Sequence, residues 1–163
     1  MCLIQSMLKN NIKNIVFSST AAVYGDITEN TPVIEEHSTL PINPYGSSKL
    51  MSEKIIIDCS KAYGLNYSIF RYFNVAGAHE KYPIGQKGKG VTSLITLTLQ
   101  SASNSKNHLN VFGNNFPTFD GTGGRDYIHV VDLVRAHILS LDKLFKNEIN
   151  IYNLGNENVL SVL

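Results

Sequence analysis

The chain has 163 residues, 43% of them hydrophobic, which suits a single globular domain with a real core. A formal net charge of +1 gives no electrostatic argument for binding nucleic acid or an anionic membrane. Cys2 and Cys59 are too few for a disulfide framework, and no apolar run approaches the roughly 20 residues of a membrane span. No signal-peptide pattern opens the chain, so we expect a cytoplasmic protein.

Apolar strands and amphipathic helices alternate along the first half of the chain. Apolar residues at helical spacing predict a helix over residues 1–10, and Ile15–Phe17 is a short buried strand. A long loop over residues 20–43 precedes a helix over Pro44–Tyr63, and Tyr67–Phe73 is the next strand. This order predicts a parallel sheet with helices packed against it.

The second half continues the pattern. The elements expected there are a loop over 74–90, a helix over 91–102, a short strand over 110–112, a loop over 113–124, an extended segment over 126–129, a helix from Val130 to Leu144, a strand over 150–154 and a new helix over 159–163. The fold class is therefore α/β, with a doubly wound parallel (Rossmann-like) sheet. In such sheets ligands bind beyond the carboxyl ends of the strands.

One helix start carries a catalytic pattern. Asn43 is a suitable N-cap and Pro44 suits the first helical position, so Tyr45 and Lys49 lie one turn apart on one helical face. A lysine beside a phenol favours the phenolate, which makes Tyr45 a candidate proton acceptor. The alternative is a purely structural role, in which the tyrosine packs on an amphipathic helix and the lysine is solvated.

Polar side chains also follow two predicted strands. Ser18, Ser19 and Thr20 come after the first strand, and Asn74 comes after the second. Because the carboxyl ends of parallel strands share one edge, these groups and the Tyr45 turn should meet at one rim. The five histidines do not cluster at ligand spacing, so we expect no metal site.

Five ordered blocks resemble the extended short-chain dehydrogenase/reductase superfamily. They are Phe17–Gly25, Asn43–Lys49, Arg71–Asn74, Ala76–His79 and Gly121–Val130. Within the superfamily they are similar to the NAD-dependent epimerases that act at C4 of UDP-hexoses. The related dehydratases carry acidic residues after the threonine, whereas this chain has Ala21 and Ala22 there, which disfavours dehydration.

The resemblance implies an NAD-binding sheet, a smaller sugar-nucleotide domain and specific catalytic roles. Tyr45 would be the general base on the sugar 4-hydroxyl, Lys49 would assist Tyr45 and bind the nicotinamide ribose, and Thr20 would hydrogen-bond the same sugar oxygen. Thr20, Tyr45, Lys49 and Phe73 would contact NAD. Family members often form homodimers through the helix that carries the tyrosine.

The resemblance also implies a set of residues that bind the UDP-sugar. Arg125 would pair with the diphosphate, and Ser93 departs from the asparagine usual at its position. The full set is Thr20, Tyr45, Asn74, Ser93, Leu94, Asn110, Val111, Phe112 and Arg125.

The glycine-rich dinucleotide loop of the family is missing from the sequence. In the family it would precede Met1, and the segment that closes over the sugar would follow Leu163. We therefore expect residues 1–163 to be one incomplete epimerase domain with little turnover as given. Two readings stay open: an epimerase for UDP-N-acetylhexosamine or UDP-uronate, or a non-catalytic fragment.

Overall fold

The computed structural model describes residues 2–27, 32–86, 93–103 and 108–163. Its larger sheet has three parallel strands in the order β1-β2-β5. They are β1 (Asn14–Ser18), β2 (Asn66–Tyr72) and β5 (Asn150–Leu154). The central strand β2 is buried from Tyr67 to Arg71, as expected of a parallel strand covered on both faces.

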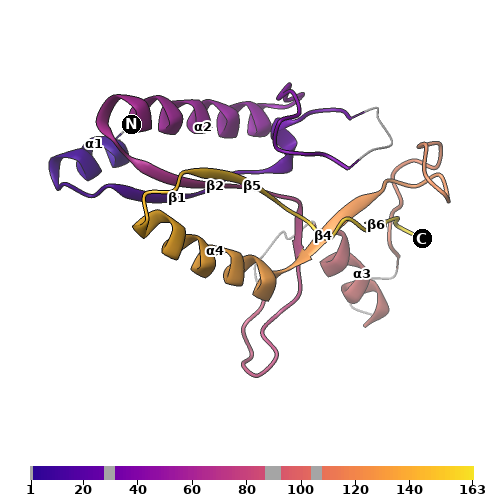
Figure 1. Ribbon diagram of the computed structural model, residues 1–163. Coiled ribbons are helices and arrows are strands. Elements are labelled where there is room, and N and C mark those ends of the chain that lie inside the picture. Colours follow the sequence, from indigo (N-terminus) through magenta and orange to yellow (C-terminus); the bar gives the residue numbers. More distant parts are fainter. Residues whose placement is uncertain (1, 28–31, 87–92, 104–107) are drawn as a thin grey trace.

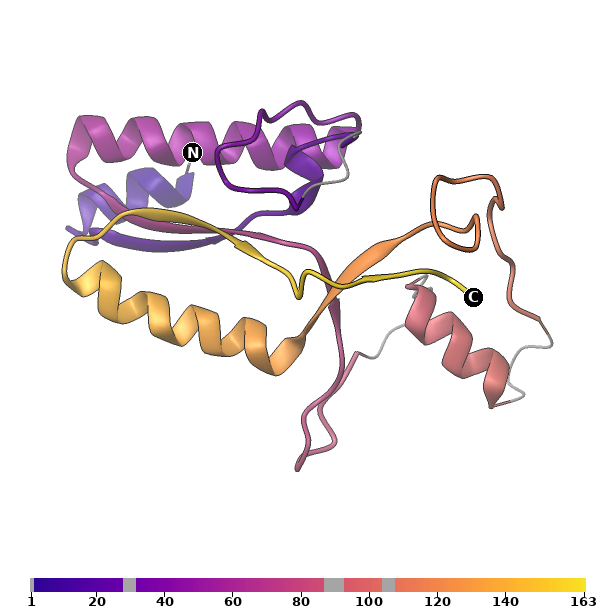
Figure 2. The same cartoon turned by 45° about the vertical axis from the view of Figure 1, so that its right-hand side comes forward.

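Helices cover both faces of this sheet. Figures 1 and 2 show α1 (Cys2–Lys9) and α2 (Pro44–Tyr63) on one face and α4 (Val130–Phe145) on the other. The core on the first face is built from Ile4, Met7, Ile56, Leu65, Tyr67 and Ile69. The doubly wound α/β fold predicted from the sequence is confirmed.

Local chemistry sets both ends of α2. The Asn43 side chain accepts a hydrogen bond from the Gly46 N–H at 2.8 Å, and Pro44 occupies the first turn. The helix ends at Gly64, which has a left-handed φ of 66° and donates its N–H to the Ser60 carbonyl at 2.8 Å. Both predicted ends of this helix are correct.

A smaller sheet extends from the carboxyl end of the larger one. It contains β3 (Asn74–Ala76), β4 (Arg125–His129) and β6 (Val159–Leu160), with β3 parallel and β6 antiparallel to β4. In both views α3 (Leu94–Ala102) lies beside this sheet, away from α1 and α2.

Three predicted elements in this region are wrong. The loop predicted from residue 74 begins with β3, whose three residues are too few to show a period. Residues 110–112 form no strand, although they are locally apolar. Residues 159–163 form no helix, because Val159 and Leu160 pair with β4. The helix expected from Val91 begins at Leu94, and residues 91 and 92 lie outside the described ranges.

Within those ranges, no helix is both long and apolar enough to cross a membrane.

Candidate active site

Tyr45 and Lys49 meet the carboxyl end of β1 at the first turns of α2. The Lys49 ammonium donates to the Ser18 carbonyl at 2.8 Å. It lies 5.8 Å from the centroid of the Tyr45 ring and 5.2 Å from that of Phe17. At these distances a cation is attracted by both aromatic faces. The Tyr45 side chain remains accessible, with 54% of its surface exposed.

Thr20 reaches the same rim through a 3₁₀ turn, η1 (Ala21–Val23), that follows β1. Its hydroxyl oxygen accepts a hydrogen bond from the Ala22 N–H at 3.2 Å. The first turn of α2 packs against the same residue: a Cβ on Gly46 would lie 2.5 Å from the Ala22 carbonyl oxygen. Both Thr20 and the helix start therefore contact Ala22, which places the Thr20 turn beside the first turn of α2.

A cavity of about 1090 Å³ opens along the smaller sheet. Apart from Thr20 and Tyr45, all the predicted substrate-binding residues line this cavity, and they come from four separate segments of the chain. They are Asn74, Ser93, Leu94, Asn110, Val111, Phe112 and Arg125. Asn74 begins β3, so the cavity starts where the chain leaves the carboxyl end of β2.

The cavity combines donors for an anion with apolar surface. Arg125 contributes a guanidinium whose Nη1 donates to the Gly124 carbonyl at 2.7 Å. Ser93 is the N-cap residue of α3, and its hydroxyl lies 2.8 Å from the Thr96 hydroxyl oxygen. Phe112 is 84% exposed and offers an aromatic face. An arginine, a helix amino end and an exposed ring can bind a phosphate attached to a flat base.

Phe73 does not line this cavity. It extends β2 by one residue, donating its N–H to the Leu154 carbonyl at 3.1 Å. Its ring packs beside Gly155, where an added Cβ would lie 3.0 Å from Phe73 Cδ2. The structure thus places Phe73 at the carboxyl end of β2, on the rim of the larger sheet.

Several cavity residues were not predicted from the sequence, among them Gln86, Phe116 and Tyr127. Gln86 and Phe116 lie in irregular segments, where no periodicity marks which side chains face inward.

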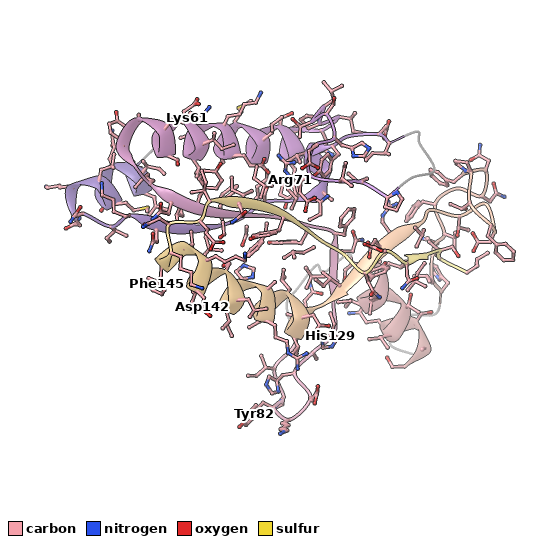
Figure 3. All side chains as sticks on the ribbon, in the orientation of Figure 1. Lys61, Arg71, Tyr82, His129, Asp142 and Phe145 are labelled. Carbon is pink, nitrogen blue, oxygen red and sulfur yellow. The ribbon has the colours of Figure 1, made fainter. Side chains whose placement is uncertain are left out.

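A buried ion pair behind the rim was also missed. Arg71 Nη2 lies 2.7 Å from Glu53 Oε2, and Arg71 Nε donates to both carboxylate oxygens at 3.2 Å. The Ser19 hydroxyl donates to the same carboxylate. Figure 3 shows Arg71 between α2 and the sheet. The spacing of four that joins Tyr45 to Lys49 continues to Glu53, and this was the available sequence signal.

The other side of the Arg71 guanidinium binds the loop after β1. Its Nη1 donates to the Tyr24 hydroxyl at 3.0 Å and to the Glu35 carbonyl at 3.1 Å. Tyr24 donates to Asn153 Oδ1 at 2.7 Å. Burial raises the pKa of Tyr24, outweighing the opposite effect of Arg71. Burial alone would lower the pKa of Arg71, but the hydrogen bonds to Glu53 and Tyr24 and the Glu53 charge raise it.

In the part of the chain that the structure describes, no three or more histidine, cysteine, aspartate or glutamate side chains group as metal ligands would.

A doubly wound sheet with a polar turn at its carboxyl edge and a cavity beside it is the arrangement in which α/β proteins commonly bind nucleotides. The model of the NAD dependent epimerase/dehydratase family matches residues 1–155, and the chain belongs to this family.

Sequence and structure similarities support this family assignment. The UDP-glucose 4-epimerase of Halalkalibacterium halodurans is 44% identical over 161 residues, which are 98% of this chain and 48% of that protein. The UDP-glucose 4-epimerase of Brucella ovis in complex with NAD superposes with a TM-score of 0.92 at 38% identity, covering 98% of this chain and 49% of that one. The Bifidobacterium longum enzyme in complex with NAD+ and UDP gives 0.91 at 41% identity, with 98% and 48% covered. The chain spans about half the length of these relatives.

Proposed function

We propose that residues 1–163 form the catalytic middle of an NAD-dependent UDP-glucose 4-epimerase, which interconverts UDP-galactose and UDP-glucose. The observation that carries this proposal is the Lys49 ammonium held at the strand rim, 2.8 Å from the Ser18 carbonyl and 5.8 Å from the Tyr45 ring. The cavity that opens beside this rim, lined by Asn74 and Arg125, supports the nucleotide-sugar part of the proposal.

The residues at the rim fit the cofactor. Lys49 and the exposed Tyr45 offer polar groups beside the edge at which nucleotides bind in doubly wound sheets. We assign Thr20, Tyr45, Lys49 and Phe73 to the nicotinamide side of the site. When bound, NAD supplies a carbon that can take a hydride from C4 of the sugar and return it.

The chain's own residues manage the proton. Tyr45, as phenolate, accepts the proton of the sugar 4-hydroxyl and later returns it to the same oxygen. The positive charge of Lys49 favours that phenolate. The Thr20 hydroxyl can both donate and accept, so it can hold the C4 oxygen in either of its states.

The cavity residues hold the rest of the substrate. Arg125 pairs with the diphosphate, since a planar guanidinium matches phosphate oxygens with two donors. Asn110, Val111 and Phe112 line the uracil end, while Asn74, Ser93 and Leu94 face the sugar and its neighbouring phosphate.

The test uses the protein at its full natural length, purified without added cofactor. Denaturation should release a nicotinamide nucleotide, and UDP-galactose should be converted to UDP-glucose. Parallel assays with UDP-N-acetylgalactosamine and a UDP-uronate separate the neighbouring epimerase activities. Absence of both bound nicotinamide and turnover would refute the proposal and favour a non-catalytic protein.

A further inference from the structure

Glu53 lies on the same face of α2 as the two catalytic candidates. Tyr45, Lys49 and Glu53 follow one another at a spacing of four, which stacks them along one side of the helix. Exposure falls along this row, from 54% at Tyr45 to 1% at Glu53. The row therefore runs from the accessible rim into the protein, and its deepest member is a charged group.

Two contacts fasten this face of α2 to the carboxyl end of β1. The Lys49 ammonium binds the Ser18 carbonyl at 2.8 Å, and the Glu53 carboxylate accepts from the Ser19 hydroxyl. Ser19 is fully buried, and its own N–H donates to the Phe70 carbonyl of β2 at 2.8 Å. Thr20 is the next residue, so its position depends directly on where Ser19 is held.

Arg71 fixes the carboxylate that makes the second contact. Three donor–acceptor pairs join Arg71 to Glu53, at 2.7, 3.2 and 3.2 Å. Its remaining nitrogen, Nη1, binds Tyr24 at 3.0 Å, and Tyr24 lies immediately after η1. The guanidinium thus holds the segment from Ser19 to Tyr24 at both ends, directly at Tyr24 and through Glu53 at Ser19, and Thr20 lies between those ends.

The energetics of a buried pair favour a role beyond stability. Taking two charges out of water costs so much that well-packed apolar residues of similar volume often stabilise a protein as well or better. What such a pair adds is a fixed geometry, because a bidentate arginine–carboxylate contact allows one arrangement.

We propose that Glu53, Arg71 and Ser19 are positioning residues, which hold the Thr20 turn against the Tyr45–Lys49 face of α2. This inference rests on the proposed epimerase function, because that reaction needs Thr20 and Tyr45, with Lys49 beside Tyr45, to act on one carbinol. A displacement of about 1 Å in such a group can cost about 100-fold in rate.

Ser19→Ala is the most selective test, because it removes one contact and leaves the Glu53–Arg71 pair intact. Glu53→Gln is the conservative variant of the pair, since it keeps an acceptor for Ser19, and Glu53→Ala removes that acceptor. The matched control is Leu144→Ala on α4. Leu144 is 2% exposed and lies at the end of α4 beside Phe145, which Figure 3 shows apart from Arg71, so this change destabilises the core and leaves the Ser19–Glu53–Arg71 contacts in place.

The assay measures kcat and KM for UDP-galactose with the protein at its full natural length, at a temperature where every variant is folded. Ser19→Ala should lower kcat by about 10-fold or more with little change in KM, as expected for a misplaced reacting group. Glu53→Ala should lower kcat further and Glu53→Gln should recover part of the loss. Leu144→Ala should keep wild-type kcat.

If Ser19→Ala and Glu53→Ala lose no more kcat than Leu144→Ala, the network is only structural and the inference is wrong. An inactive wild-type protein would instead refute the epimerase function itself. Should the Glu53 variants fail to fold, Ser19→Ala decides alone.

Discussion

Lys49 is the residue on which the chemistry of the rim depends most closely. Among the residues that the structure describes, its ammonium is held by a neutral carbonyl, that of Ser18 at 2.8 Å, and not by a carboxylate. A carboxylate beside it would neutralise its field, whereas a carbonyl orients the charge and leaves it to act on the Tyr45 ring 5.8 Å away. The nearby carboxylate of Glu53 is instead occupied by Arg71.

Lys49→Met keeps the length of the side chain and removes its charge. We expect kcat to fall by about 10²- to 10⁴-fold, the usual contribution of a working acid–base group. Measuring kcat for UDP-galactose tests this, with Lys54→Met as an exposed control on the same helix. Unchanged kcat in Lys49→Met would remove the lysine from the mechanism.

Tyr24 gives a prediction about stability and pH. Because burial raises its pKa, the folded protein keeps the proton that the unfolded chain loses near pH 10. This stabilisation is complete below about pH 10 and is lost as pH rises towards the higher pKa of the folded state.

Tyr24→Phe should therefore cost about 1–3 kcal/mol at neutral pH, since Arg71 and Asn153 lose a hydrogen-bond partner. The difference from wild type should narrow above about pH 10. Urea unfolding at several pH values measures it. A difference that stays constant or widens in alkali would contradict this assignment.

At the scale of elements, the proposed site depends on the close contact between the first turn of α2 and η1. Gly46→Ala would normally favour a helix, by about 1 kcal/mol. Here the added Cβ would lie 2.5 Å from the Ala22 carbonyl oxygen and 2.9 Å from Pro41 Cβ, so we expect the variant to lose stability.

Thermal unfolding measures this effect, and epimerase activity should fall with it because the Tyr45 turn moves off the rim. Lys54→Ala is the control: it also places alanine in α2, at an exposed position. A Gly46→Ala protein with raised stability and normal activity would show that the contact with η1 is unimportant.

The same elements show what the sequence could predict. Helix α2 was predicted from Pro44 to Tyr63, as observed, because Asn43, Pro44 and Gly64 are strong local signals. The strand β6 was predicted as a helix, because its two residues depend on pairing with β4 and carry no period of their own. Short segments owe their structure to distant partners, which single-chain patterns cannot show.

The candidate site also contains parts that the sequence predicted and parts that it did not. The Tyr45–Lys49 turn was predicted from spacing within one helix, and the substrate-binding residues were predicted from the family resemblance. The buried network around Arg71 was missed, because its members come from positions as far apart as Ser19 and Asn153. Only the fold brings them together.

At the scale of the whole molecule, the first turn of α2 with Tyr45 lies at the edge of the larger sheet, and the cavity lies along the smaller sheet. The chain spans about half the length of its relatives, so we propose that polypeptide beyond these residues completes the domain. The 163-residue chain alone should then show little or no epimerisation, because its sequence contains no G-x-G-x-x-G motif to hold the cofactor's diphosphate. Turnover by the isolated chain comparable to that of the full-length protein would contradict this.

The central claim is that the Tyr45 phenol is the base of the reaction. The most direct measurement is kcat for UDP-galactose in Tyr45→Phe at full natural length, with bound nicotinamide and folding checked in the same sample. Since only the phenolic oxygen is removed, we predict that kcat falls by about 10²- to 10⁴-fold while the cofactor stays bound. Near-normal kcat in a folded, cofactor-loaded Tyr45→Phe protein would contradict the account.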